Sequence, residues 1–146
     1  MHCCLGLHSQ TQAIYSYYYG NEINSDGDLI TYNKDGIRLV KSFHSVISYD
    51  RLLGSVSRLK DEIYYQHLYD LPVASSGSSF SHINSGAGFS KFFPEQLTND
   101  GNARNYGVEL TLERFFSGGY YFLLTGYLFD SKYKTLENVW RTTSFN

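Results

Sequence analysis

The segment NYGVELTLERFFSGGYYFLLTGYLFDSKY, from Asn105 to Tyr133, alternates polar and apolar side chains before its Ser-Gly-Gly stretch and is mostly apolar and aromatic after it. Successive side chains of a β-strand point to opposite faces, so this alternation predicts a hairpin that turns at Ser117–Gly119. On the first arm, one face collects Tyr106, Val108, Leu110, Leu112 and Phe116, and the other collects Gly107, Glu109, Thr111 and Glu113. Such a hairpin needs an apolar environment on one face and a polar environment on the other.

The composition narrows the classes of protein that fit this pattern. No run of about 18 apolar residues occurs, so the sequence predicts no transmembrane helix. Transmembrane strands carry a weaker signal of about 10 alternating residues, and that class stays open. The net charge of −2 argues against nucleic acid as a partner, because nucleic-acid binding needs a basic patch. The 14 tyrosines suit a pleated surface that meets both oil and water.

The N-terminal segment MHCCLGLHSQ lacks the basic start and the apolar stretch of a secretory signal. An outer-membrane protein needs such a signal, so on that interpretation we expect the chain to be a fragment. Cys3 and Cys4 are adjacent, without the C-x-x-C spacing of metal and redox sites. We assign these two cysteines no role.

Five strands are predicted, joined by long and short connections in alternation. They are Leu5–Tyr18, Val40–Tyr49, Ser57–Tyr69, Asn105–Phe116 and Tyr120–Tyr133. The connections 20–36 and 71–104 are long and rich in turn-forming residues, whereas those near 50–55 and 117–119 are short. We therefore expect an all-β, antiparallel meander whose curved sheet stays open.

Residues 52–68 also fit a helix, since Leu52, Val56, Leu59 and Ile63 fall at helical spacing. Gly54 interrupts that pattern, and we predict a strand. One face of this strand then collects Leu59, Ile63, Tyr65 and Tyr69, and the other collects Arg58, Lys60, Glu62, Tyr64 and Gln66. Large hydrophilic side chains of both charges suit a water-filled lumen, although a soluble sandwich shows the same alternation.

No constellation of residues typical of an enzyme occurs. On a strand, Glu109 and Glu113 lie roughly 13 Å apart, beyond the roughly 6.5–9.5 Å of inverting glycosidases. The segment SSGSS lacks a nucleophile elbow, and the glycines match no phosphate-binding motif. We predict no catalytic residue, no metal site and no cofactor. Four of the five histidines are scattered and form no metal-binding pattern: His8, His44, His67 and His82.

Aromatic residues gather at the ends of predicted strands. One cluster is Tyr15, Tyr17, Tyr18 and Tyr19, and another is Phe115, Phe116, Tyr120 and Tyr121. Outer-membrane barrels carry aromatic girdles where the rings meet the lipid headgroups. A soluble sheet with exposed tyrosines, or a surface that stacks sugars, shows similar clusters, so the residues alone leave these interpretations open.

Five stretches of the chain, taken in order, resemble a known family. They are GLHSQTQAIYSYY, SFHSVISYDRLL, RLKDEIYYQHLYDLPV, RNYGVELTLERFFSGGYYFLLTGYLFDSKY and VWRTTSFN. Together they resemble the late barrel strands of TonB-dependent outer-membrane receptors, in the branch with a carboxypeptidase-regulatory-like domain. The resemblance extends over nearly the whole chain from Gly6. It implies that residues 1–146 form an open part of a 22-stranded barrel of transmembrane strands.

The resemblance also implies a function. The complete protein would contain an N-terminal plug and would take a scarce ligand across the outer membrane with energy from the TonB complex. The implied partners are outer-membrane lipid, the TonB complex through the missing N-terminal part, and an iron chelate such as a siderophore, a cobalamin or an oligosaccharide. The chain departs from the family pattern at Asp61, which stands on the expected lipid face where a small apolar residue is usual.

Two other functions stay open: a plugless, porin-like barrel and a soluble, aromatic-rich domain that binds carbohydrate. In outer-membrane barrels the periplasmic turns are short and the extracellular loops are long. The connections 20–36 and 71–104 and the tail 135–146 are therefore expected outside the cell, and ligand contacts are expected from their aromatic residues. These candidates are Tyr32, Phe80, Phe89 and Trp140.

Overall fold

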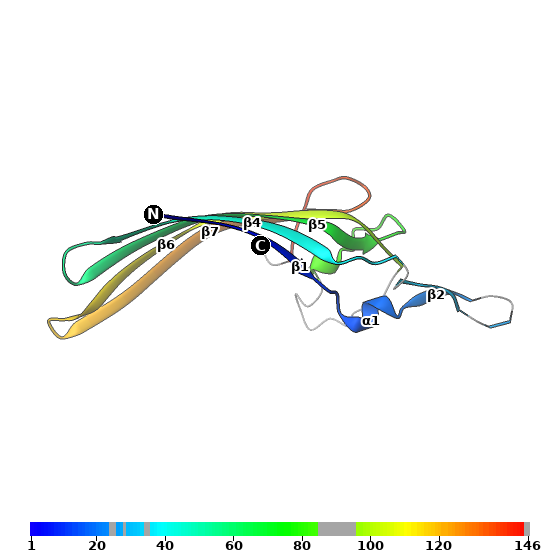
Figure 1. Ribbon diagram of the computed structural model, residues 1–146, viewed down its shortest axis with the longest axis horizontal. Coiled ribbons are helices and arrows are strands. Elements are labelled where there is room, and N and C mark those ends of the chain that lie inside the picture. The colour runs from blue at the N-terminus through cyan, green and yellow to red at the C-terminus, as the bar shows by residue number, and fades with distance from the viewer. Residues whose placement is uncertain (24–25, 28, 34–35, 85–95, 145–146) are drawn as a thin grey trace.

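The computed structural model describes residues 1–23, 26–27, 29–33, 36–84 and 96–144. Its main feature is a six-stranded antiparallel sheet in the order β1-β4-β5-β6-β7-β8, beside a separate hairpin of β2 and β3. The strands of the large sheet pair in chain order, and its edge strands β1 and β8 do not meet (Figure 1). The all-β, antiparallel, open meander predicted from the sequence is therefore confirmed.

The large sheet consists of β1 (His2–Gln10), β4 (Val40–Leu52), β5 (Ser57–Ala74), β6 (Leu97–Ser117), β7 (Tyr120–Lys134) and β8 (Arg141–Thr142). The small hairpin consists of β2 (Gly20–Ile23) and β3 (Leu29–Tyr32). Two short helical segments, α1 (Ile14–Tyr17) and η2 (His82–Asn84), complete the described elements. Among the described residues, no helix is long and apolar enough to cross a membrane.

Glycines with positive φ close the two tight hairpins at one end of the sheet, which we call the turn end. Gly118 (φ 65°) and Gly119 (φ 88°) form the two-residue loop between β6 and β7. A type I′ turn needs positive φ at both of these positions. Gly54 (φ 76°) serves the turn between β4 and β5. The longer connections lie at the opposite end, the loop end (Figure 1).

The register fixes which side chains share a face of the curved sheet. Glu109 pairs with Glu62 and Tyr127, and by alternation this set lies on the same side of the sheet as Ala103 and Tyr133, which pack with Ile83 of η2 on the concave side. Leu110, the next residue of β6, pairs with Asp61 and points to the convex side. Figure 1 shows α1 and η2 below the sheet, on the concave side, and the connection between β7 and β8 above it, on the convex side.

A small core lies on the concave side at the loop end. Its buried members are Val40, Leu71, Ala103 and Tyr133, and Leu68 and Ile83 pack against them. The Tyr133 hydroxyl donates a hydrogen bond to the Ser79 carbonyl at 2.9 Å, which holds the connection after β5 against the core. Towards the turn end, no second layer of described residues covers the sheet, and many large apolar side chains are exposed there.

A bulge in β5 separates this core from the rest of the sheet. The pairing with β6 shifts between Leu68 and Leu71 and again between Leu71 and Val73. Asp70 has a φ of 57° within the bulge, and two basic side chains hold its carboxylate. Glycine is needed opposite, because a Cβ on Gly101 would lie 2.4 Å from Val73 Cγ1.

The first predicted strand, Leu5–Tyr18, is wrong beyond Gln10. β1 ends at Gln10, and α1 follows four residues later. The helical turn lets Ser16 reach the His82 imidazole on η2 at 2.7 Å, a contact that a continued strand would not make. The predicted position of Tyr15, Tyr17, Tyr18 and Tyr19 at the end of a strand is therefore also wrong, because these residues lie in or next to α1.

Other predicted connections contain additional strand residues. β5 continues to Ala74 and β6 begins at Leu97, so the predicted connection 71–104 shrinks to 75–96. Pro72 argues against a regular strand, but it lies where the bulge already interrupts the pairing. The connection 20–36 contains β2 and β3, and the tail contains β8. The strand predicted over Ser57–Tyr69 is confirmed, and its helical alternative is wrong.

Gly107 is expected to tolerate no side chain. A Cβ there would lie 2.6 Å from the Leu128 carbonyl oxygen and 2.8 Å from the Tyr64 hydroxyl. Gly107→Ala should lower the free energy of unfolding by about 1–3 kcal/mol, the usual range for overpacking. Gly126→Ala is the matched control, since nothing lies within 4 Å of a Cβ at that position. Urea unfolding of the detergent-folded chain measures both variants, and equal losses would contradict this prediction.

Candidate functional site

A ladder of hydrogen-bonded side chains crosses the concave face near the loop end. The Thr143 hydroxyl donates to Ser131 Oγ at 2.9 Å, and Ser131 Oγ donates to Asn105 Oδ1 at 2.5 Å. The Asn105 amide then donates to Gln66 Oε1 at 2.7 Å, and Gln66 Nε2 donates to Ser42 Oγ at 3.0 Å. We call these five residues the polar ladder; it joins β4, β5, β6, β7 and the residue after β8.

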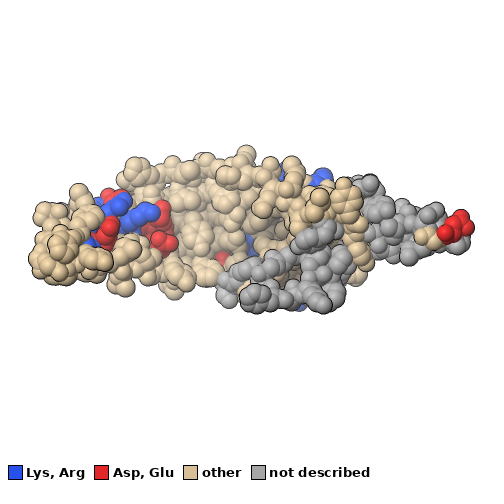
Figure 2. Space-filling view, turned by 90° about the horizontal axis from the view of Figure 1, so that it is seen from below, with Lys and Arg blue, Asp and Glu red and all other residues tan. Residues whose placement is uncertain are grey.

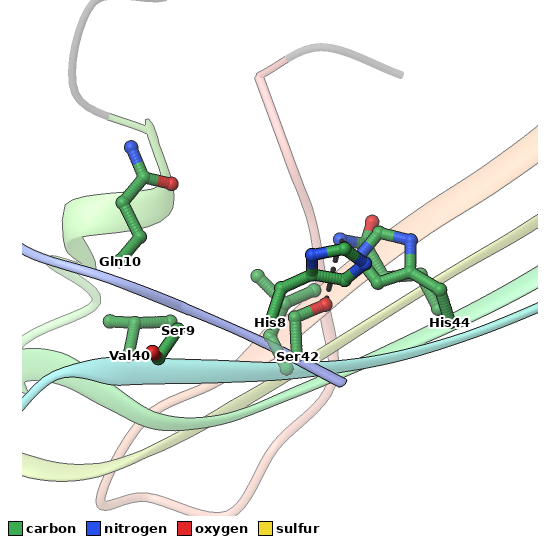
Figure 3. A pocket seen from close by; sticks show the side chains of 8 residues that line it. His8, Ser9, Gln10, Val40, Ser42 and His44 are labelled. Atoms are coloured by element: carbon green, nitrogen blue, oxygen red, sulfur yellow. Dashed lines mark hydrogen bonds between the residues drawn. The ribbon is translucent and has the colours of Figure 1, made fainter. Parts of the chain in front are cut away.

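The polar ladder ends at a hollow of about 330 Å³ between β1, β4 and β5. Gln66 Nε2 also donates to His44 Nε2 at 2.9 Å, so the ring proton of His44 lies on Nδ1. The His8 ring packs edge-on against the His44 ring, with centroids 4.8 Å apart. Figure 3 shows the two imidazoles side by side above Ser42. Three of the residues that line the hollow, Ser42, His44 and Gln66, are thus already hydrogen-bonded to one another.

Charged side chains of both signs gather on the concave face towards the turn end (Figure 2). Arg58 forms an ion pair with Asp50 and lies 3.8 Å from Glu113, and Lys60 lies 2.5 Å from Glu62. These groups are partly exposed, so water screens the attraction within each pair. The concave face of β4, β5 and β6 therefore needs water beside it.

The concave side of β7 differs from that of its neighbours. Leu123 and Tyr127 point to this side and are 66% and 68% exposed, and Phe129 follows them. The rings of Tyr127 and Phe129 lie 5.9 Å apart. This apolar stripe faces the same space as the ion pairs of β4, β5 and β6.

The convex face carries a broad band of exposed apolar side chains. Exposure rises from 41% at Ile47 to 81% at Leu128. Soluble monomers rarely expose a contiguous apolar patch larger than a few hundred Å², whereas five neighbouring strands contribute here. We call this surface the apolar band. Its members are Leu5, Leu7, Ile47, Tyr49, Ile63, Tyr65, Val108, Leu110, Phe122, Leu124 and Leu128.

Arginines stacked on aromatic rings mark both ends of the apolar band. At the turn end, the guanidinium carbon of Arg114 lies 4.4 Å from the Tyr120 ring centre. At the loop end, that of Arg104 lies 4.3 Å from the Trp140 ring centre. The two arginines are ten residues apart on the convex side of β6, which corresponds to roughly 33 Å along the strand.

Asp61 interrupts the apolar band, on the face that the sequence predicted. The register places it between Tyr49 of β4 and Leu110 of β6. It forms no salt bridge with any residue that the structure describes. A carboxylate in apolar surroundings is costly. The effect of Asp61 on stability therefore depends on whether water or an apolar medium covers the apolar band.

A buried contact holds α1 to the connection after β5. Ser16 Oγ lies 2.7 Å from His82 Nε2, and both residues are buried. Burial lowers the pKa of the His82 imidazole below 6.5, because desolvation disfavours the charged form. The neutral ring favours the folded state above pH 6.5, and this contribution is lost as the pH falls from 6.5 through the lowered pKa.

Three of the four aromatic residues predicted as ligand contacts lie in the described part of the chain, and the structure gives them separate places. Tyr32 ends β3, and Phe89 lies outside the described residues. Phe80 is half-buried and follows Ser79, which the core holds on the concave side. Trp140 lies on the convex side, stacked against Arg104. Contact with a transported ligand stays a prediction for these residues.

Sequence reasoning missed the polar ladder and the Trp140 contacts. Ser42, Gln66 and Asn105 occupy alternating positions that mark them as concave, but only the pairing register shows that they share one line across the sheet. Among the described residues, no group of three or more His, Cys, Asp or Glu side chains is placed to hold a metal ion.

Comparisons with known protein families, with curated proteins and with solved structures find no match for this chain. The two faces of the sheet differ in chemistry. The concave face is polar and carries the polar ladder, and the convex face is apolar between two arginine–aromatic contacts.

Asn105 joins the two halves of the polar ladder, and its loss is expected to destabilise the sheet. Asn105→Leu removes the acceptor of Ser131 and the donor to Gln66 at once. Leaving buried polar groups without partners costs about 1–3 kcal/mol, so the variant should unfold at lower urea concentration by that margin. Asn102→Leu, on the other face of the same strand, is the control. A larger loss for the control would show that the ladder does not stabilise the sheet.

Proposed function

We propose that this chain forms part of the wall of an outer-membrane β-barrel, with the apolar band facing lipid and the concave face turned to the lumen. The size of the band carries this proposal. The roughly 33 Å between Arg104 and Arg114 along β6 becomes a height of roughly 25 Å once strands tilt by about 35–45°. Outer-membrane barrels have an apolar belt of about that height between two aromatic girdles.

The curvature and the open edges also support a barrel wall. The sheet bends with its polar face inside (Figure 1), as a barrel with a hydrated interior requires. β1 and β8 leave the sheet unclosed, and open edges expose unpaired N–H and C=O groups that are not tolerated in lipid. Further strands beside β1 and β8 would satisfy those groups.

Within outer-membrane barrels, we propose a TonB-dependent receptor that takes up a scarce ligand, such as an iron chelate, a cobalamin or an oligosaccharide. The resemblance of the five quoted stretches supports this class. The concave stripe of Leu123, Tyr127 and Phe129 favours it over a plugless porin, because apolar side chains gain by contact with a plug and not by contact with water. The energy-coupling complex would act through the part of the receptor that carries the plug.

A soluble carbohydrate-binding domain is the other candidate class. The aromatic content favours it, since Tyr and Trp rings stack on sugars. The apolar band argues against it, because Leu110, Leu124 and Leu128 are at least half exposed and adjoin one another on β6 and β7. In water, this exposed apolar surface would promote aggregation.

Leu110 lies near the middle of the apolar band and gives the direct test. Leu110→Arg should lower the free energy of unfolding from phosphatidylcholine vesicles by about 2–4 kcal/mol, the cost of arginine at the midplane on the lipid face. Thr111→Arg is the control, because the next residue points to the concave side beside Glu109. Urea titration of the vesicle-folded chain measures both. Equal losses, or a wild-type chain that is a stable monomer without lipid or detergent, would exclude the proposal.

A substitution at Asp61 tests the same orientation, but here the expected change is a gain in stability. If lipid covers the apolar band, Asp61→Leu should raise the free energy of unfolding by about 1–2 kcal/mol, since a carboxylate there costs somewhat less than an arginine. Glu62→Leu, on the concave side, should instead destabilise by breaking the contact with Lys60. The same vesicle titration compares the two variants. A loss of stability for Asp61→Leu would argue against a lipid-facing convex side.

A further inference from the structure

Trp140, the single tryptophan of the chain, stacks with two cations on the convex side at the loop end. The Arg104 guanidinium carbon lies 4.3 Å from its ring centre, and Lys134 Nζ lies 5.5 Å from it. Lys134 also donates to Asn138 Oδ1 at 2.7 Å, which holds the connection between β7 and β8 in place. We call Arg104, Lys134 and Trp140 the Trp140 cluster. Its members are held in place by one another and by Asn138.

The cluster carries positive charge that its neighbours do not balance. In the described part of the chain, neither Arg104 nor Lys134 forms a salt bridge. Asp130 on the same face is already engaged by Lys132 at 3.1 Å and by the Tyr106 hydroxyl at 2.7 Å. Three cations therefore stand against one carboxylate on neighbouring positions of β6 and β7, which makes the patch attractive to an anion.

The pairing register of Arg104 indicates an anion with several oxygens. Arg104 lies directly opposite Lys132, and like charges opposite each other on paired strands are destabilising. A phosphate group relieves this repulsion, because its oxygens accept charge-assisted hydrogen bonds from a guanidinium and an ammonium together.

The Trp140 cluster adjoins the apolar band. Arg104, Tyr106 and Val108 follow one another on the convex side of β6, so aromatic and apolar surface begins about 7 Å along the strand from Arg104. An amphipathic anion can place its phosphate on the cluster and its acyl chains along Val108 and Leu128. A free phosphate ion would use only the first of these contacts.

We propose that the Trp140 cluster binds the phosphate group of a membrane lipid headgroup. The proposal rests on the proposed function, because only a lipid-facing convex side brings acyl chains to the apolar band. Arg104 and Lys134 contact the phosphate, and the indole keeps both cations in position while its exposed edge meets the headgroup layer. Trp140 then anchors the barrel wall to lipid and does not contact the transported ligand.

Trp140 fluorescence reports on this cluster directly, because the chain has no other tryptophan. The whole chain, folded in dodecyl maltoside micelles, is titrated with phosphatidic acid, with diacylglycerol of the same acyl chains and with inorganic phosphate. We expect a saturable change with phosphatidic acid, none with diacylglycerol, and weaker binding of inorganic phosphate. An equal response to diacylglycerol overturns the proposal, and so does inorganic phosphate that binds as tightly as the phospholipid.

Substitutions that keep the tryptophan test the cations themselves. Arg104→Gln and Lys134→Gln should each weaken phosphatidic acid binding about fivefold, and the double variant about 25-fold, the effect expected of one and two basic residues near a membrane surface. Arg58→Gln, on the concave face, is the control and should bind as the wild type does. Unchanged binding by the double variant, or an equal loss in the control, overturns the proposal.

Failure of the lipid site and failure of the proposed function are distinguishable. Brominated phosphatidylcholine in vesicles should quench Trp140, because the convex side meets acyl chains near the headgroups. Without that quenching, the membrane orientation itself is wrong. With it, but without a preference for phosphatidic acid over diacylglycerol, only the headgroup site is wrong.

Discussion

Each strand of a single-layered sheet presents alternate residues to opposite sides. Each side therefore needs surroundings that match its own side chains, whether polar or apolar. Over β4, β5, β6 and β7 the described residues supply no second layer towards the turn end. The features described above follow from this constraint. Ion pairs and the polar ladder use water or one another on the concave side, while no described residue packs over the apolar band. In the proposed function, a bilayer on the convex side would supply the missing contact.

Different interactions stabilise the sheet along its length. At the loop end, apolar packing around Leu71 and Tyr133 excludes water. Next to it, the polar ladder joins the strands through neutral hydrogen bonds, which salt does not screen. At the turn end, pairs such as Arg58 with Asp50 are partly exposed and weaken with ionic strength. We therefore expect the hairpin turns to open before the core does when the protein is destabilised in solution.

The features with a local cause could be predicted from the sequence. Alternation with period two predicted which residues of β5 and β6 share a face, including the charged Asp61 on the apolar face. Gly118–Gly119 predicted a tight turn. The end of β1 could not be predicted, because α1 depends on a contact between Ser16 and His82 from distant parts of the chain. The bulge at Asp70 and the rungs of the polar ladder likewise depend on register. For Trp140, the sequence shows an aromatic residue in a tail but not the side of the sheet on which it packs.

The length of β6 has a consequence for the outer end of the proposed barrel wall. Beyond Arg104, β6 continues for seven residues to Leu97, paired with the far end of β5 and packed on the small core. At about 3.3 Å per residue and the usual tilt, this extension would rise roughly 18 Å above the rim of the apolar band. In the proposed orientation, the paired ends of β5 and β6 therefore stand above the lipid surface. An arriving ligand would meet these strand ends before it met headgroups, and strand length would set the height of that first encounter.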